Sequence, residues 1–359
     1  MTTLPKTPLK TPSRGRLIFL LLFVAVATVA WAFFLLSFIS KIQLSPSPAV
    51  SSNSSTPLSE TAPLPATPEK PTTTSLLTGK TINLDRQLKT PVAVVIENLV
   101  EARPQQKGLE EADIVYETVA EGGITRFLAI YGENRPLSMG PVRSARPYFV
   151  DWAKEYSGAF VHVGGSPDAM EALTSSGNIL NIDEQLDNPV IARDKDYAAP
   201  HNAFTSMEGV VDWITRSHFK HALKAPRFTF ETPTETLNRV QVIAIDFSTS
   251  LYAVKYIFNS EKQTYERKMA GEPHQDIHPT NVLIQFTDQQ VVDDVLRMSI
   301  QTQGTGKAIL FHNGEVIHGS WQKNENDMTQ FYNQDNRPMT LSPGQTWIEV
   351  VSKDTKILL

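Results

Sequence analysis

Cysteine is absent from this sequence of 359 residues. Its absence excludes disulfide bonds, thiolate zinc sites, cysteine nucleophiles and any lipid attached to a cysteine. A basic excess is also missing. Residues 1–70 hold six basic and two acidic residues, so the remainder has 27 Lys and Arg against 36 Asp and Glu, a net charge of −9. Nucleic-acid-binding domains normally carry a basic excess, and we therefore expect no nucleic-acid partner.

Motifs that indicate a cofactor or a familiar catalytic centre are lacking as well. The sequence contains no Walker loop, no nucleophile elbow and no His-Glu-x-x-His pair. We therefore expect no cofactor. The absence of these motifs leaves both an enzyme and a binding protein possible.

Charged residues are missing from one long stretch near the N-terminus. Leu17–Ile39 contains 23 residues, of which only Thr28 and Ser37 are polar. As a helix this stretch is ~34 Å long, enough to cross a hydrocarbon core of ~30 Å. Four basic side chains lie within residues 1–16, whereas Lys41 alone follows closely. This asymmetry predicts a cytoplasmic segment over residues 1–16 and a membrane anchor over residues 17–39.

A cleaved signal peptide is the alternative explanation of this run. Signal peptides have an apolar region of ~7–15 residues that ends at small residues. Here the apolar run continues beyond Ala30–Ala32, the one candidate cleavage motif. The sequence therefore favours an uncleaved single-pass anchor in the cell membrane, with all later residues outside the cytoplasm.

The chain after the anchor divides into a linker and two regions of different texture. Ser, Thr and Pro dominate residues 40–79, and such a composition cannot offset the entropy of ordering, so we expect a disordered linker. The remainder predicts an α+β protein, with a mixed α/β domain over residues 80–228 and a β-rich, sandwich- or barrel-like domain over residues 237–359. Residues 224–238 look like the connection between them.

Hydrophobic periodicity predicts the elements of the first domain. Short apolar runs predict strands at residues 91–97, 113–119, 125–131 and 159–163, the middle two forming a hairpin. One-sided apolar patterns predict helices over residues 147–156, 168–174 and 205–224, whereas residues 178–200 look irregular. The second domain alternates nine short strand-like runs with turn residues.

Several short motifs are distinctive as a set. In the first domain they are Ile96–Asn98, Ala102–Pro104, Gly108–Leu109, Ala112–Glu117, Gly123–Arg126, Gly140–Arg146, His162–Ser166 and Pro200–Asn202; in the second they are Asn281–Val282, Gly319–Lys323 and Pro343–Ile348. Together, over about residues 82–352, they resemble the YerB-like family of bacterial lipoproteins. The resemblance implies a two-domain protein of the cell envelope. The sequence departs from the lipoprotein pattern because it has a spanning helix and no cysteine to carry a lipid.

Two arginines lie three residues apart in Gly140–Pro147, a segment framed by Gly and Pro. The guanidinium fork suits phosphate, sulfate or carboxylate, so Arg143 and Arg146 predict an oxyanion site. Arg126, which follows a Gly-Gly turn, can point at the same place. The alternative is that these arginines only staple loops by pairing with carboxylates. The available partners are Glu97, Glu117 and Glu121.

Two histidines and a serine are candidates for catalysis. His201 is the first candidate and His162 the second, because each lies at a strand end or in a loop, where functional groups usually gather. Imidazoles beside guanidiniums can act as general acid and base. Ser166 is the third candidate, as a nucleophile, although it also suits the cap of the following helix. A loop histidine can equally be structural.

The candidate ligand-binding residues are expected to converge on one cleft of the first domain. Neighbouring elements in sequence are usually neighbours in space, and long irregular stretches are often functional. The expected members are Arg143, Arg146, His162, Arg193, His201 and Asn202, with Arg126 beside them. Such a cleft predicts either a module that binds an anionic envelope polymer, ligand or protein partner, or an envelope enzyme acting on a phosphorylated or carboxylated glycan or lipid intermediate. The missing catalytic motifs favour binding.

Metal binding has a weaker signal. Glu272, His274, Asp276 and His278 lie close together in sequence, but the prolines at 273 and 279 do not favour a helix that would place both histidines on one face. We therefore predict no metal site. Trp321 and Trp347 are expected to fill the core of the second domain rather than to stack on sugars.

Overall fold

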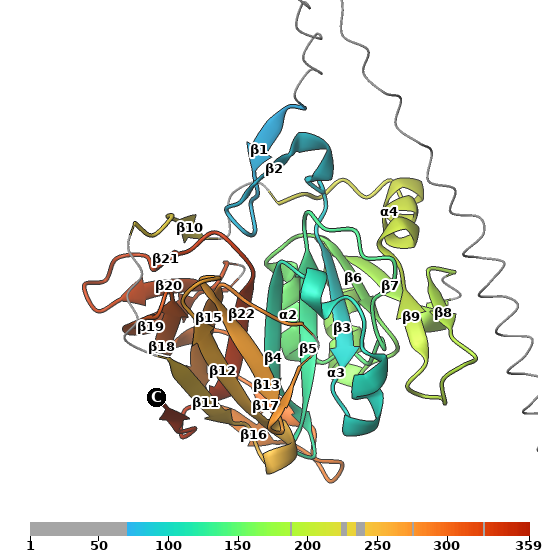
Figure 1. Ribbon diagram of the computed structural model, residues 1–359. Coiled ribbons are helices and arrows are strands. Elements are labelled where there is room, and N and C mark those ends of the chain that lie inside the picture. Colours follow the sequence, from blue (N-terminus) through green and yellow to red (C-terminus); the bar gives the residue numbers. More distant parts are fainter. Residues whose placement is uncertain (1–69, 187–188, 224–227, 235–240, 275, 326) are drawn as a thin grey trace, which may run out of the picture. The chain divides into compact units, whose positions relative to one another are not determined.

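The computed structural model describes residues 70–186, 189–223, 228–234, 241–274, 276–325 and 327–359 (Figure 1). The expected cytoplasmic segment, the expected anchor and residues 40–69 of the expected linker lie outside these residues, as does much of the expected connection at residues 224–238. Within the described residues, no helix combines the length and the apolar character that a membrane span requires.

A mixed ten-stranded sheet forms the centre of the described part. Its strand order is β20-β19-β18-β15-β22-β4-β5-β3-β6-β7. In that order the strands span Gln330–Asn333, Glu315–Lys323, Gly304–His312, Asn281–Thr287, Thr346–Ser352, Ile114–Glu121, Ile124–Tyr131, Val92–Glu97, Ala159–His162 and Leu180–Asp183. The sheet is continuous because β22, close to the C-terminus, lies parallel to β15 on one side and parallel to β4 on the other.

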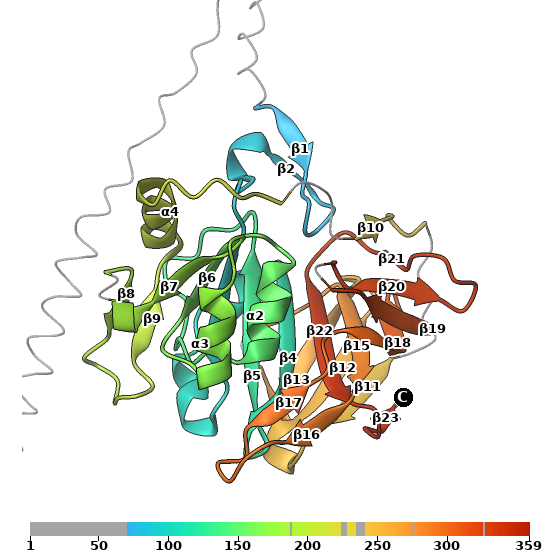
Figure 2. The ribbon, with the colours of Figure 1, turned by 180° about the vertical axis from the view of Figure 1, so that it is seen from behind.

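Different elements cover the two faces of this sheet. An antiparallel sheet of order β14-β13-β12-β11-β23 covers one face (Figure 1). Its strands span Glu272–Pro273, Thr264–Met269, Ala253–Asn259, Val242–Asp246 and Ile357–Leu358. Helices α2 (Pro147–Lys154) and α3 (Pro167–Thr174) cover the other face (Figure 2). The helix α4 (Met207–Arg216) packs on the same face as the five-stranded sheet.

Short elements complete the described part. Four ribbons pair β1 (Thr72–Thr74) with β2 (Thr81–Asn83), β8 (Ile191–Arg193) with β9 (Ala203–Thr205), β10 (Thr229–Phe230) with β21 (Thr340–Leu341), and β16 (Gln289–Val291) with β17 (Met298–Ile300). Single 3₁₀ segments span Leu84–Arg86, Val100–Gln105, Leu109–Glu111, Glu184–Leu186 and Ser250–Tyr252.

Both expected domains contribute to each core. Every residue of β3 and of β15 is buried, so both of their faces are covered. Val94 and Val282 belong to the core that contains α4 and the five-stranded sheet, whereas their neighbours Val95 and Leu283 belong to the core that contains α2 and α3. This is the period-two alternation of a strand. Trp321 and Trp347 are fully buried as expected, but in the two different cores. The helical first region and the β-rich second region are thus the two parts of one sheet-centred body.

Local differences from the expected elements have physical causes. The described part of residues 178–200 is only partly irregular, because β7 pairs in parallel with β6 and β8 pairs with β9. The helix expected over residues 205–224 ends at Arg216, and His218 follows in the left-handed region with φ 54°. Order begins before residue 80, because β1 pairs with β2 and Leu77 is completely buried.

Candidate functional site

The arginine segment, residues 140–147, is held from three sides by its own backbone. Its amides donate to carbonyl groups of β9, of β3 and of the turn after β6: Val142 to Ala203 at 2.7 Å, Arg143 to Val95 at 2.9 Å and Ala145 to Gly164 at 2.9 Å. Gly140 has φ 149°, and a Cβ there would lie 2.8 Å from the Ala203 carbonyl oxygen. Glycine is therefore required at this position, and the two arginines that follow start from a fixed backbone.

Arg126 and Arg146 are occupied by internal contacts. Both bind the carboxylate of Glu121, Arg126 at 2.6 Å, and both are almost completely buried. Each guanidinium also donates to a main-chain carbonyl, Arg126 to Ser144 at 3.0 Å and Arg146 to Ala145 at 2.7 Å. Burial by itself would raise the pKa of the Glu121 carboxyl group. The two guanidiniums outweigh this effect, so the pKa of Glu121 lies below its ordinary value. These two arginines therefore hold the arginine segment to the β4–β5 hairpin, as the stapling alternative expects.

Arg143 is arranged differently from the other two arginines. Its Nε lies 3.0 Å from Glu97 Oε1 without hydrogen-bond geometry, so the contact is an ion pair only. The other oxygen of the same carboxylate lies 2.9 Å from Nδ1 of His201. The side chains of Arg143 and His201 are 25% and 19% exposed, while that of Glu97 is 4% exposed. Glu97 thus joins two candidates that are 58 positions apart in the sequence.

Arg193, which is exposed, and Asn202, which is buried, form a second unit beside His201. Arg193 binds both oxygens of Glu184, at 2.7 and 2.5 Å, and donates to Asn202 Oδ1 at 3.0 Å. Asn202 in turn donates to the Asp194 carbonyl at 3.1 Å. The hydrogen bond to Glu184 raises the pKa of Arg193. This unit closes the loop on which His201 stands, and most of its hydrogen-bonding capacity is used internally.

His162 and Ser166 do not face the other candidates. His162 is completely buried, and its ring nitrogens lie 2.8 Å from the Gly164 carbonyl and 2.6 Å from Asn181 Oδ1. Ser166 accepts a hydrogen bond from the Ala169 amide and caps α3. Of the six residues expected in one cleft, the structure therefore gathers Arg143 and His201 on one carboxylate. Arg193 and Asn202 lie next to them, whereas Arg146 forms an ion pair with Glu121 instead.

The region of His274 and His278 gives no ligand cluster. His274 is buried and His278 is exposed, so the two rings do not share an environment. Within the described residues, no group of three or more His, Asp or Glu side chains is placed to hold a metal ion. Burial, and next the charge of Arg267, hold the pKa of His274 well below its ordinary value. His274 is therefore a neutral hydrogen-bonding side chain of the interior.

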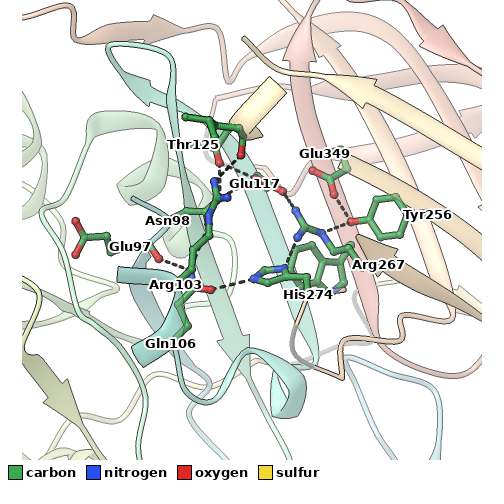
Figure 3. A network of polar contacts seen from close by, with 12 residues as sticks. Glu97, Asn98, Arg103, Gln106, Glu117, Thr125, Tyr256, Arg267, His274 and Glu349 are labelled. Atoms are coloured by element: carbon green, nitrogen blue, oxygen red, sulfur yellow. Dashed lines mark hydrogen bonds and ion pairs between the residues drawn. The ribbon is translucent and has the colours of Figure 1, made fainter. Parts of the chain in front are cut away.

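A fully buried ionic network, which the sequence patterns did not reveal, lies between the two sheets (Figure 3). Arg267 on β13 binds the carboxylate of Glu117 on β4, donates to Tyr256 Oη at 3.0 Å and contacts His274. Both Arg267 and Glu117 are completely buried as side chains. Tyr256 donates to Glu349 on β22, and the guanidinium lies 4.5 Å from the ring centre of Trp347. The two halves of the chain therefore meet around one buried cation.

This network contains two carboxyl groups for one guanidinium. Burial, and next the negative charge of Glu117, raise the pKa of Glu349 well above its ordinary value, against the opposing effect of Arg267. A hydrogen bond to Glu117 acts in the same raising direction. Glu349 Oε2 accepts no hydrogen bond within the described residues. We therefore treat Glu349 as the protonated member and Glu117 as the ionised partner of Arg267.

Polar side chains connect the buried network to Glu97 (Figure 3). Gln106 donates to the Glu97 carbonyl at 2.5 Å, and its Oε1 lies 2.9 Å from Nε2 of His274. Asn98 donates to Thr125 at 2.6 Å and to Glu117 at 3.3 Å. The residues after β3 therefore position Glu97 from behind, and through Glu97 they position Arg143 and His201.

Comparison with known proteins extends over both halves of the chain. The N-terminal domain of DUF3048, described as a protein family of unknown function, matches residues 77–220, and its C-terminal domain matches residues 243–348. A Bacillus subtilis (strain 168) protein named "Putative lipoprotein YerB" is 32% identical over 270 residues, which cover 73% of this chain and 81% of that protein. The crystal structure of the YerB protein from Bacillus subtilis matches with a TM-score of 0.72 at 31% identity, covering 80% of this chain and 100% of that one.

Proposed function

This chain belongs to the DUF3048 family, and on that premise we propose that it is a membrane-tethered protein of the cell envelope that binds an anionic ligand through Arg143 and His201. The tether rests on the apolar run Leu17–Ile39 and the basic residues before it. The Bacillus relative is named a lipoprotein. In this chain, which has no cysteine, a spanning helix would replace the lipid as the attachment.

One observation carries the proposed binding site: Arg143 and His201 share the carboxylate of Glu97 and keep their outer nitrogens unused. Among the described residues, neither the two terminal nitrogens of Arg143 nor Nε2 of His201 has a hydrogen-bond partner. Both side chains reach the surface, whereas Glu97 does not. A phosphate or carboxylate placed there receives charge-assisted hydrogen bonds from a fixed fork.

The local charge favours an anion as well. The described residues around the arginine segment place three guanidiniums, those of Arg126, Arg143 and Arg146, beside two carboxylates, those of Glu97 and Glu121. Burial lowers the pKa of Arg143 from its ordinary value. Glu97 opposes this shift, whereas the positive charges of Arg126 and Arg193 add to it. Arginine nevertheless stays protonated. A bound anion would relieve this excess of positive charge.

The test is a thermal melt of the full chain with inorganic phosphate and, separately, succinate as probes. A ligand at a hundred times its Kd stabilises the folded state by about 2.7 kcal/mol, which corresponds to roughly 5–10 °C in Tm. Arg143→Gln removes charge-assisted hydrogen bonds worth about 1.5–3 kcal/mol, so it should weaken binding roughly 10- to 100-fold. Arg216→Gln is the matched control, because Arg216 is an exposed arginine paired with Asp212.

The results separate ligand binding from loop stapling. An anion effect that Arg143→Gln abolishes and Arg216→Gln keeps supports the proposal. If neither anion changes the Tm of the wild type, while Arg143→Gln lowers Tm strongly, then Arg143 is only a structural partner of Glu97 and the proposal fails.

The Glu97–His201 contact favours a second candidate function, an envelope enzyme that acts on a phosphorylated or carboxylated glycan or lipid intermediate. A carboxylate on Nδ1 fixes the imidazole tautomer and leaves Nε2 to exchange a proton with a bound substrate. Arg143 beside it would stabilise the developing negative charge.

Hydrolysis of p-nitrophenyl phosphate by the full chain distinguishes the two candidates. The enzyme hypothesis expects His201→Gln to abolish turnover while phosphate still raises Tm. Equal, negligible hydrolysis by wild type and variant, with intact anion binding, leaves binding as the function.

A further inference from the structure

A second cavity, remote from Arg143 in the sequence, lies between α4 and the start of β3. Its volume is about 560 Å³, within the range of small-molecule sites. The segment Gln87–Thr90, Arg135, α4 and residues 218–222 line it. Leu88 and Ile214 form a buried apolar floor, with Val211 and Phe219 beside them.

Local structure explains why this cavity exists. The chain leaves α4 through the left-handed residue His218 and turns back, so that Phe219, Lys220 and His221 form a wall rather than a further helical turn. The Thr90 hydroxyl donates to the His221 carbonyl at 2.9 Å and fixes this wall to the sheet. The early end of α4, which the sequence periodicity did not predict, therefore opens the cavity.

The charge of the cavity is opposite to that of the chain as a whole. Lys89, Arg135 and Lys220 line it together with His218 and His221, and none of the described lining residues is acidic. Within the described residues, no carboxylate pairs with any of the three cations. Unpaired cations above an apolar floor recognise a molecule that is anionic at one end and apolar at the other.

The position of the cavity indicates where such a molecule would come from. Both α4 and the β1–β2 ribbon lie at the same end of the described part in both views (Figures 1 and 2), and the expected anchor at residues 17–39 precedes β1 in the sequence. Leu137, two residues after Arg135, is 91% exposed, and Leu84, three residues before Gln87, is 53% exposed. Exposed leucines beside unpaired cations suit an anionic membrane surface.

We propose that this cavity binds an acidic membrane lipid, with the headgroup on Lys89, Arg135 and Lys220 and part of the apolar tail over Leu88 and Ile214. Bound in this way, the cavity would hold the face formed by α4 and residues 218–222 against the bilayer. The inference rests on the membrane attachment in the proposed function but not on the site at Arg143.

The experiment uses the full chain in nanodiscs of phosphatidylcholine with or without phosphatidylglycerol. Ser217→Cys, at the end of α4 beside the cavity, carries an environment-sensitive fluorophore, and labelling is specific because the chain has no other cysteine. The expected result is a blue shift that needs phosphatidylglycerol. Replacing Lys89, Arg135 and Lys220 by Gln should shift the docking equilibrium roughly a hundredfold, because each basic residue contributes roughly a factor of five at an anionic surface.

Two matched variants test the site itself. Arg216→Gln removes a cation of the same helix that does not line the cavity, and it should keep the blue shift, as should Arg143→Gln. Thr215→Trp fills the cavity from an exposed lining position and should abolish the shift. Equal losses in Arg216→Gln and in the triple variant would show general surface attraction and overturn the proposal. So would an unaffected Thr215→Trp variant, or the same signal in both lipids.

The remaining outcomes are also decisive. If the protein co-purifies with the nanodiscs but gives no lipid-dependent signal, this inference is wrong and the proposed tether is unaffected. The same result is expected if another part of the chain or a second copy fills the cavity. Failure to co-purify with either nanodisc contradicts the tether in the proposed function, and this inference falls with it.

Discussion

Replacing Glu349 should cost the protein little, although its side chain is completely buried and charged residues in such positions are normally sensitive. Burial and Glu117 raise the pKa of Glu349 well above its ordinary value, which favours the neutral acid in the folded protein. Glu349→Gln exchanges one neutral hydrogen-bonding group for another of the same shape. At a pH below the unfolded pKa of about 4.5, where folded and unfolded states both carry the proton, we expect its effect on the free energy of unfolding to stay within about 1 kcal/mol, the size of a net hydrogen bond.

Arg267→Met provides the contrast. It removes the guanidinium that binds Glu117 and leaves that buried carboxylate without its ion-pair partner between the two sheets. Breaking a buried ion pair in this way costs about 3–5 kcal/mol, or roughly 6–20 °C in Tm. Glu117→Gln is a less clean test, because Glu349 can then ionise in its place beside the same guanidinium.

The pH dependence provides an independent check. A carboxyl group with a raised native pKa binds more protons in the folded than in the unfolded state, so its stabilising contribution is complete below the unfolded pKa of about 4.5. The contribution disappears as the pH rises from there through the native pKa. The glutamine side chain of the Glu349→Gln variant cannot lose a proton. The Tm of this variant should therefore rise relative to the wild-type Tm as the pH increases across that range. The reasoning is refuted if Glu349→Gln costs as much as Arg267→Met, or if the difference in Tm does not change with pH.

Two further predictions concern the organisation of the chain. Protease added to intact spheroplasts should release a fragment that starts between residues 42 and 80, because the linker is expected outside the cytoplasm; protection until lysis would contradict that topology. Limited proteolysis should cut within residues 224–238, but the two fragments should stay associated on size exclusion under native conditions, because β22 lies between β15 and β4; separation into two stable halves would show that each half has a sufficient core of its own.

Local patterns predicted those elements whose form depends on neighbouring residues. The β4–β5 hairpin, α2 and α3 follow from alternation, a Gly-Gly turn and Pro at the first helical position, and all three are present. The strands β7 and β8 were missed because each is short and is stabilised by a partner elsewhere in the chain. The continuity of the large sheet depends on the pairing of β22 with β4, about which periodicity carries no information.

The candidate site was predictable in its members but not in its partners. Arg143 and His201 were expected together, yet the carboxylate that joins them lies in a buried strand, and nothing in the sequence marks Glu97 as their common partner. The buried network left two signals, Glu117 and Glu349, each a carboxyl group in the middle of an apolar strand; a charge there requires a buried partner. Arg267 is less conspicuous because Glu266 and Lys268 flank it, although period two places it on the same face as Tyr265 and Met269.

The order in which the chain is synthesised gives the place of β22 in the sheet a further meaning. β4 ends at residue 121, whereas β22 begins at residue 346, so the ribosome delivers the first strand long before the one that lies beside it. In the meantime one edge of β4 has no hydrogen-bonding neighbour, and an open edge can pair with another chain. Such distant pairing also forms slowly. Nascent and prematurely terminated chains are therefore the ones expected to aggregate through β4. Synthesis of β22, the last strand of the large sheet, covers this edge and removes the risk.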